Sequence, residues 1–392
     1  MRGPQPRLNK PHTASRNNGV QSVARACEVL KYLQRAATNV TLDAVCKNID
    51  LPRPTSYRLL STLVSSGMVE RVSKNSYRLL NQQTQQRLRI GYASQSEEFS
   101  FSRLVCESIR SSAYRANIEV LVLDNHYSSK AAIRNADAFV HKHVDLVIEF
   151  QTNHQSASLV SSKLLEAGIP LIAIEIPHPG ASYYGADNYR AGIIGGRALG
   201  RACLERWGGV ADEVILLELP AAGPLPRSRM TATLAGLREI LPRFPDEKAF
   251  FLDGKGRFEG SLAVMRKHLL KSRAKKTLLA ALNDPSCLGG LQAFEEGGRI
   301  GECLAVGHNA SIEARREMRR SGSALIGSVG YFPEKYGDAI IKLALDKIHG
   351  REVPPATFVK HRLIHPGNVN NLYPNDAEIT FADNDALLYS KR

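Results

Sequence analysis

The chain has 392 residues, with 52 Lys and Arg against 38 Asp and Glu and a formal net charge of +14. This length provides for two or three domains, and the positive charge predicts a polyanionic partner. The six cysteines show no C-x-x-C spacing, so we expect neither a disulfide framework nor a cysteine-ligated metal site. No apolar run reaches membrane-spanning length and no signal-peptide core is present, so we expect a cytoplasmic protein.

The positive charge is concentrated at the start of the chain. Residues 1–87 carry 14 Lys and Arg but only 4 Asp and Glu, a net +10, whereas the other 305 residues have a net +4. Residues 1–19 are rich in Pro, Asn and Arg and contain no acid, which predicts a disordered basic arm. Such an arm either contacts phosphates or is an inert tail.

Residues 20–80 have the pattern of a winged helix-turn-helix. A first helix is expected over 20–35, and Thr41 can cap a second that ends before Pro52. The following helix has leucines on its inner face and small, polar or basic residues outside, a composition that suits the major groove. Its candidate DNA contacts are Arg53, Thr55, Ser56, Tyr57, Arg58 and Ser61.

Two short alternating strands, at 68–72 and 76–79, follow as a wing. Its candidate phosphate contacts are Arg71, Lys74 and Arg78. The order VQSVARACEVLKYL, LPRPTSYRLLSTLVSSGMVERV and SYRLL resembles the winged helix-turn-helix of IclR-type transcriptional regulators. That resemblance implies binding to double-stranded DNA as a homodimer. The alternative is a small helical subdomain unrelated to DNA.

A polar linker is expected at 81–87, and from residue 88 strands alternate with helices, which predicts α/β architecture. We expect two parallel-sheet lobes within 88–374. The chain should pass from one lobe to the other near 205–212 and near 325–335, and the tail at 375–392 is uncertain. The expected strands are 88–94, 118–124, 144–150, 169–176, 212–219, 249–252, 277–284, 302–309, 324–330 and 358–364. The expected helices are 101–116, 129–143, 155–167, 187–206, 230–241, 260–272, 287–297, 312–321 and 336–349.

This order of elements, with GADNYRAGIIGGRALG, ALNDPSCLGGLQAFEEGG, AVGHNASIEARREM and SVGYFPEKYGDAIIKLAL, resembles the type 1 periplasmic sugar-binding proteins. It is equally similar to the sensor domains of LacI/GalR-type repressors. The resemblance implies a bilobed domain whose pocket is built from loops at the strand ends. The residues that the resemblance offers for the pocket are Glu98, Phe99, Phe101, Glu175, Arg229, Thr231, Phe258, Asn283, Asn309 and Tyr331. The position of the family's pocket arginine is occupied by Thr231, and Arg229 lies slightly upstream of it.

Each of three pocket candidates has a structural alternative. Asn283 can cap a loop, although we expect Asp284 to cap the following helix, Glu175 can be a solvated rim residue, and Phe258 can be ordinary core. Two arginine pairs, at 315–316 and 319–320, are interpreted as an exposed helix face. Gly192, Gly196 and Gly200 recur every four residues and predict close packing on the sheet or on a partner.

These features together predict a ligand-responsive transcriptional regulator whose effector is a small molecule, a sugar or sugar-like polyol. The resemblances imply a homodimer. The sequence contains no phosphate loop, metal-ligand cluster or nucleophile with a base at a recognisable spacing, so neither an enzyme, a cofactor nor a metal is expected. The alternatives are a sugar- or nucleotide-acting enzyme and a transport solute-binding protein.

Overall fold

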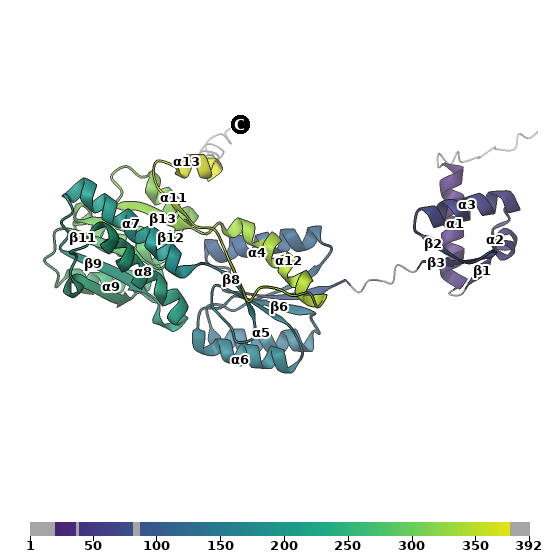
Figure 1. Ribbon diagram of the computed structural model, residues 1–392, viewed down its shortest axis with the longest axis horizontal. Helices are drawn as coiled ribbons and strands as arrows, with labels where there is room; N and C mark the ends of the chain where they lie inside the picture. The colour runs from purple at the N-terminus through teal and green to yellow at the C-terminus, as the bar shows by residue number, and fades with distance from the viewer. Residues whose placement is uncertain (1–19, 37–38, 81–86, 377–392) are drawn as a thin grey trace, which may run out of the picture. The chain divides into compact units, whose positions relative to one another are not determined.

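The computed structural model describes residues 20–36, 39–80 and 87–376, and the chain divides into two compact units, 1–87 and 88–392 (Figure 1). The expected arm at 1–19, residues 81–86 of the expected linker and residues 377–392 of the expected tail lie outside the described residues. In the described part of the chain, no helix is long and apolar enough to cross a membrane.

The N-terminal unit, here called the head, is a three-helix winged fold. Its elements are α1 (Gln21–Ala36), β1 (Val40–Thr41), α2 (Leu42–Ile49), α3 (Arg53–Ser65), β2 (Val69–Ser73) and β3 (Ser76–Leu79). The three strands form an antiparallel sheet in the order β1-β3-β2. The helices close over a core that includes Val29, Val45, Leu60 and Tyr77.

Local capping fixes the turn between α2 and α3. The Thr41 side chain accepts a hydrogen bond from the Ala44 N–H, which confirms the expected cap. Asp50 ends α2 in the left-handed conformation at φ 53°, and Pro52 precedes the first residue of α3. Proline tolerates this position because it lacks the N–H that a helix interior would need.

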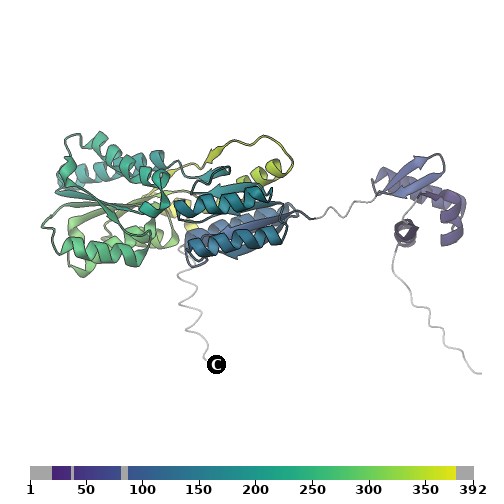
Figure 2. The same ribbon diagram turned by 90° about the horizontal axis from the view of Figure 1, so that it is seen from below.

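The C-terminal unit consists of two lobes, each built on a six-stranded sheet (Figures 1 and 2). Lobe 1 has the strand order β14-β8-β7-β6-β4-β5, and lobe 2 has the order β10-β9-β11-β12-β13-β15. All pairs are parallel except β13 with β15. The α/β fold of two parallel-sheet lobes is therefore confirmed.

The elements of lobe 1 are β4 (Arg89–Ser94), α4 (Ser100–Arg115), β5 (Glu119–Asp124), α5 (Ser129–His141), β6 (Leu146–Glu149), α6 (His154–Glu166), β7 (Leu171–Ile174), β8 (Ser182–Gly185), α12 (Tyr336–Ile348) and β14 (Ala356–Phe358). Helices α4 and α12 pack together, as do α5 and α6, and the two pairs cover opposite faces of the sheet (Figure 1).

The elements of lobe 2 are α7 (Asn188–Trp207), β9 (Glu213–Glu218), α8 (Pro224–Ile240), β10 (Ala249–Asp253), α9 (Phe258–Leu269), β11 (Thr277–Ala281), α10 (Asp284–Glu296), β12 (Cys303–Asn309), α11 (Ile312–Arg319), β13 (Leu325–Gly330), β15 (Arg362–Ile364) and α13 (Val369–Leu372). Helices α7 and α8 cover one face of this sheet, and α9 and α10 the other (Figure 2).

The chain passes between the lobes at three places, not two. Helix α7 packs on α8 and on the sheet of lobe 2, so the first crossing precedes Asn188 and lies well before the expected 205–212. The second crossing, between β13 and α12, is close to the expected 325–335. The third was not expected: the single late strand over 358–364 is in fact β14 in lobe 1 followed by β15 in lobe 2.

The arginines of α11 do not form a uniformly exposed face. Arg315 is buried and pairs with Asp376 at 2.5 Å, and the Asp376 carboxylate also lies 3.1 Å from Arg319. The expectation of an exposed face is therefore wrong for these two residues. Asp376, assigned from the sequence to the uncertain tail, is fixed on lobe 2 by this pair.

The glycines of α7 allow its close approach to α8. A Cβ added at Gly196 would lie 2.0 Å from the Thr233 carbonyl oxygen, so the backbones could not keep their spacing. Gly196→Ala should lower the unfolding free energy by about 1–3 kcal/mol through overpacking. Gly301→Ala, where nothing lies within 4 Å of the added Cβ, is the matched control. Equal urea midpoints for the two variants would contradict the packing explanation.

Candidate functional site

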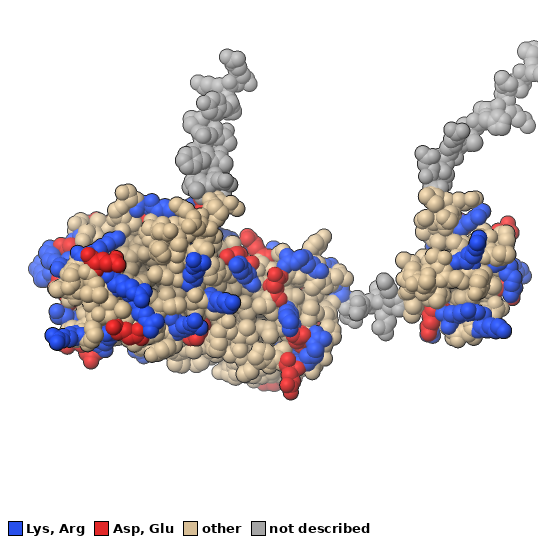
Figure 3. Space-filling model, turned by 45° about the horizontal axis from the view of Figure 1, so that its top comes forward, with Lys and Arg blue, Asp and Glu red and all other residues tan. Residues whose placement is uncertain are grey.

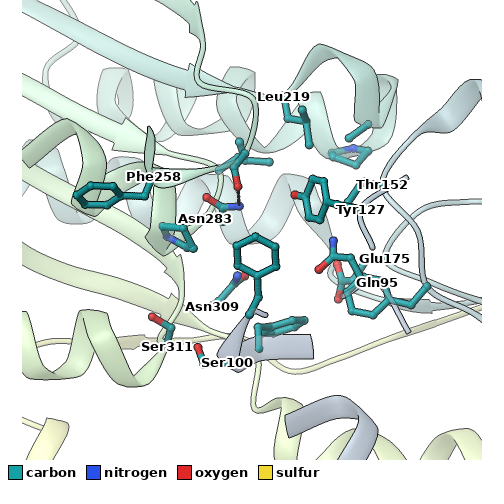
Figure 4. A pocket seen from close by; sticks show the side chains of 18 of the residues that line it. Gln95, Ser100, Tyr127, Thr152, Glu175, Leu219, Phe258, Asn283, Asn309 and Ser311 are labelled. Atoms are coloured by element: carbon teal, nitrogen blue, oxygen red, sulfur yellow. Dashed lines mark hydrogen bonds between the residues drawn. The ribbon is translucent and has the colours of Figure 1, made fainter. Parts of the chain in front are cut away.

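A cavity of about 280 Å³ lies between the two lobes (Figure 4). Its lining comes from loops that follow strands of both sheets, because the carboxyl ends of the strands in each lobe face the cleft. Lobe 1 contributes the segments after β4, β5, β6 and β7, and lobe 2 those after β9, β10, β11 and β12. A ligand here would touch both lobes at once.

Aromatic rings form the lobe 1 side of the cavity. Phe101 packs edge-on against Phe150, with ring centroids 6.2 Å apart, and against Tyr336 at 6.0 Å. Phe99 packs against Tyr127 at 5.3 Å. Such faces suit the C–H surfaces of a sugar ring or another small apolar face.

Arg229 and Glu175 meet across the lobes at the bottom of the cleft. The Arg229 Nη2 lies 3.8 Å from the Glu175 Oε2, and both side chains are almost completely buried. Arg229 also donates through Nε and Nη2 to the Asn188 Oδ1, at 3.0 and 2.7 Å. Its guanidinium lies over the Tyr331 ring, 5.0 Å from the centroid. Arg229 is thus oriented from several sides.

The Glu175 carboxylate is held by lobe 1 itself. Its Oε1 accepts a hydrogen bond from the Tyr336 hydroxyl at 2.7 Å, and its Oε2 accepts one from the Ala186 N–H at 3.3 Å. Burial raises the pKa of Glu175, while Arg229 and these two hydrogen bonds act in the opposite direction. Glu175 is therefore a buried member of an ion pair and not a solvated rim residue.

Asn283 caps α10 from the cavity wall. Its Oδ1 accepts a hydrogen bond from the Ser286 N–H at 3.0 Å, and its Nδ2 donates to the Gly256 carbonyl at 2.9 Å (Figure 4). The expectation that Asp284 is the cap is therefore wrong. The buried Asp284 instead accepts from the Ser311 N–H and the Ser328 hydroxyl, both at 2.6 Å, which ties the loop after β12 and strand β13 to α10.

The structure gathers most of the sequence-predicted pocket residues at one place. Eight of the ten line the cavity, namely Glu98, Phe99, Phe101, Glu175, Arg229, Phe258, Asn283 and Asn309. Thr231 does not, because it faces solvent on α8 and donates to the Ser228 carbonyl at 3.1 Å. Tyr331 is buried behind Arg229 and supports it without lining the cavity.

Other lining residues were not singled out from the sequence. They include Gln95, Ser100, Tyr127, Phe150, Thr152, Ile176, Leu219, Ala222, Pro226, Gly256, Leu282, Pro285, Leu288, Ser311 and Glu313. They lie in the loops that follow the strands or in the first turns of the helices after those loops. Tyr127 lies in a left-handed turn at φ 57°, an unusual conformation for an aromatic residue.

The head presents basic and polar side chains on α3 and the wing. Tyr57, Arg58 and Ser61 are exposed and Thr55 is half-buried, while Lys74 is exposed at the wing tip. Lys and Arg are distributed over the visible face of the head (Figure 3). This arrangement can place donors along a phosphate backbone.

Four candidate DNA contacts in the head have intramolecular roles. Ser56 is completely buried, so the expectation that it faces outward is wrong; its helical position turns it into the core. Arg53 pairs with Asp43 of α2, and Arg78 pairs with Glu70 at 2.7 Å. Arg71 donates to the backbone carbonyls of the wing turn at residues 73 and 74. Arg53 must exchange or share its partner to reach DNA.

A buried acid lies in the lobe 1 sheet below the cavity. The Oε1 of Glu149 accepts a hydrogen bond from the Asn125 Nδ2 at 2.8 Å, whereas its Oε2 has no partner among the described residues. Burial raises the pKa of Glu149 from 4.5 to about 8, against the effect of the Asn125 hydrogen bond. The folded protein therefore keeps this carboxyl protonated over a pH range in which the unfolded chain ionises it.

This difference predicts a pH-dependent stability. The unfolding free energy should fall as the pH rises from about 4.5 to about 8, by up to about 1.4 kcal/mol per pH unit. Glu149→Gln, which stays neutral, should flatten that slope in urea unfolding between pH 5 and 8. Glu107→Gln, on the exposed face of α4, is the control. An unchanged slope for Glu149→Gln would refute the assignment.

Comparisons with known proteins agree with this architecture. A family model described as a periplasmic binding protein domain matches residues 90–352, and one described as an IclR helix-turn-helix domain matches residues 22–73. No curated protein sequence matches the chain.

Several solved structures share the fold of the C-terminal unit. A solute binding protein of an ABC transporter from Actinobacillus succinogenes 130z, with bound D-allose, is 18% identical with a TM-score of 0.61, covering 73% of this chain and 100% of its own. One from Bacillus halodurans C-125, with bound myo-inositol, is 18% identical with a TM-score of 0.62, covering 74% and 98%. A protein from Mycobacterium smegmatis, in complex with β-D-fucofuranose, is 19% identical with a TM-score of 0.63, covering 75% and 97%.

Proposed function

We propose that this chain, which belongs to the periplasmic binding protein domain family and carries an IclR helix-turn-helix domain, is a transcriptional regulator that responds to a small sugar or polyol. In this proposal the head, residues 20–80, binds double-stranded DNA and residues 88–374 sense the ligand. A location in the cytoplasm follows from the DNA partner.

The observation that carries the proposal is the inter-lobe cavity on a chain that also has a winged head. A ligand held by Arg229 of lobe 2 and Glu175 of lobe 1 binds the closed cleft better than an open one. Only such differential affinity can shift a conformational equilibrium. Binding therefore has a route to change the arrangement of the DNA heads.

The lining favours a small, uncharged ligand. A cavity of about 280 Å³ is at the lower end of the size range of ligand sites. Three acids, Glu98, Glu175 and Glu313, line it beside Arg229, which is already paired with Glu175. Aromatic rings with amides and hydroxyls around them suit a monosaccharide or cyclic polyol. The sugars and polyols bound by the structural neighbours belong to this class.

The test is a thermal-shift screen of the full chain against D-allose, myo-inositol, other monosaccharides, nucleosides and sugar phosphates. A ligand at one hundred times its Kd should stabilise the protein by about 2.7 kcal/mol, because it binds only the folded state. We expect a neutral sugar or polyol to raise the Tm and sugar phosphates to have no effect. A shift produced only by sugar phosphates would contradict the proposed ligand class.

We also propose that the protein acts as a homodimer, because one winged head offers few base contacts and paired heads read two half-sites. Sedimentation velocity at micromolar concentration should give a dimer, both free and on DNA. A monomer under both conditions would exclude this assembly. The alternative function, a solute-binding protein for transport, would not explain why the chain carries a winged head.

A further inference from the structure

Arg257 of lobe 2 lies against two aromatic rings of lobe 1 beside the cavity. The guanidinium carbon is 4.3 Å from the centroid of the Tyr127 ring and 5.7 Å from that of the Phe99 ring. The neighbours of Arg257 in the chain, Gly256 and Phe258, both line the cavity, as do the two rings. The stacked group therefore joins the lobes next to the place where a ligand would lie.

Both loops that carry this contact are held in unusual conformations. In lobe 1, His126 and Tyr127 have φ values of 49° and 57°, and in lobe 2, Lys255 and Gly256 have values of 56° and 64°. Non-glycine residues adopt this region only when the surroundings fix them, and ligand clamps are a common location.

Carboxylates at the strand ends hold each turn. The Asp124 Oδ1 accepts from the His126 N–H at 2.6 Å, and the Asp253 Oδ1 accepts from the Lys255 N–H at 2.8 Å. Each loop is thus fixed by its own lobe, and the two meet across the cleft.

We propose that Arg257, Tyr127 and Phe99 form an inter-lobe clasp that stabilises the closed cleft. A guanidinium within 6 Å of an aromatic face is attracted by the ring quadrupole, and more strongly where water is partly excluded. The approach is close at this point, because a Cβ added at Gly256 would lie 3.2 Å from the Tyr127 hydroxyl oxygen. The clasp raises the population of the closed state before any ligand is bound.

The clasp is one of several contacts that join the two lobes across the cleft. The Ser100 hydroxyl donates to the Glu313 Oε2 at 2.9 Å, and the Gly223 backbone packs on the His154 ring. Opening the lobes must break these contacts together with the clasp and the Arg229–Glu175 pair. Removing one should change the opening equilibrium without unfolding either lobe.

The inference rests on the proposed function in one respect, that the cleft is the ligand site, but its test needs no ligand. Hydrogen–deuterium exchange of the full chain is followed in lobe 1 peptides over residues 95–101 and 125–130. In Arg257→Ala their exchange should be about 2- to 30-fold faster, the range that cation–π energies span. Peptides from β6 and β7 should stay protected.

Three further variants separate a clasp from general packing. Tyr127→Phe keeps the ring and should exchange as the parent does, whereas Tyr127→Leu should match Arg257→Ala. The double variant of Tyr127→Leu with Arg257→Ala should add little to either single change, since both remove the same interaction. Arg273→Ala, an exposed arginine of lobe 2, is the control.

Two results would overturn the proposal. One is faster exchange in Arg257→Ala confined to residues 254–260, which means local loosening of the lobe 2 loop alone. The other is a Tyr127→Phe variant as perturbed as Tyr127→Leu, which means that the hydroxyl and not the ring carries the contact. A failed sugar screen would leave these exchange rates unaffected, so the two proposals fail separately.

Discussion

Arg229→Ala should lower the unfolding free energy by about 3–5 kcal/mol, because it leaves one partner of a buried ion pair unpaired. Glu175 would keep only its hydrogen bonds within lobe 1, and the carbonyls of Asn188 and Leu282 would lose their donor. The sugar or polyol identified by the thermal-shift screen should no longer bind. Urea unfolding followed by circular dichroism and calorimetric titration measure the two effects.

The matched control for Arg229→Ala is Arg201→Ala, an exposed arginine of α7 in the same lobe. It should change stability by less than about 1 kcal/mol, as surface charges usually do. Arg229→Lys keeps the charge but cannot donate through a planar fork to Asn188, so it should fall between the parent and the alanine variant. Equal stability of the two alanine variants would show that the ion pair does not hold the cleft.

Arg58→Ala should weaken operator binding by about 1–3 kcal/mol, or roughly 5- to 150-fold, if the side chain reads a base edge from α3. Arg53→Ala should cost less, because Arg53 already pairs with Asp43 in the free head. Fluorescence anisotropy on an operator selected from a random DNA pool gives these affinities, with folding checked by circular dichroism.

Two further variants of the head test how DNA is contacted. Lys74→Ala at the wing tip should weaken binding to all sequences alike and reduce the salt slope by about one unit, as loss of a phosphate contact requires. Ser56→Ala changes a buried hydroxyl and should leave DNA affinity unchanged. If the double variant Arg53→Ala with Arg58→Ala bound DNA with full affinity, the assignment of α3 to the DNA interface would be wrong.

Most helices and strands of the head could be predicted because their determinants are local, although strand β1 was not expected and Ser56 was assigned to the wrong face of α3. Thr41 caps, Pro52 begins a new helix, and leucines recur with helical spacing in α3. Most strands of the C-terminal unit were equally clear, since buried parallel strands are continuous apolar runs. Strand β8 was missed because its four residues, Ser-Tyr-Tyr-Gly, form neither an apolar run nor an alternation of apolar and polar residues.

Features that depend on tertiary contacts could not be predicted. The sequence predicted one strand over 358–364, yet the chain leaves lobe 1 after Phe358 and enters lobe 2 at Arg362. Between them His361 accepts a hydrogen bond from the Asp187 N–H at the first crossing. The pairing of Arg315 with Asp376, 61 residues away, likewise leaves no local pattern.

The resemblance predicted several of the residues that line the candidate pocket, but it did not predict the role of each side chain. Eight of the ten residues that the resemblance offered line the cavity. The capping of α10 by Asn283 and the orientation of Arg229 by Asn188 depend on which neighbour lies within hydrogen-bond reach. Spacing in the sequence does not contain that information.

In the proposed function, a ligand in the cleft controls DNA binding by the same chain. We would titrate the full chain on its selected operator by fluorescence anisotropy, with and without a saturating amount of the sugar or polyol that raises its Tm. We expect the Kd for DNA to change by about fivefold or more, the usual size of allosteric coupling, and to be insensitive to the sugar in Arg229→Ala. Identical DNA affinities with and without the sugar in the parent protein would contradict a ligand-responsive regulator.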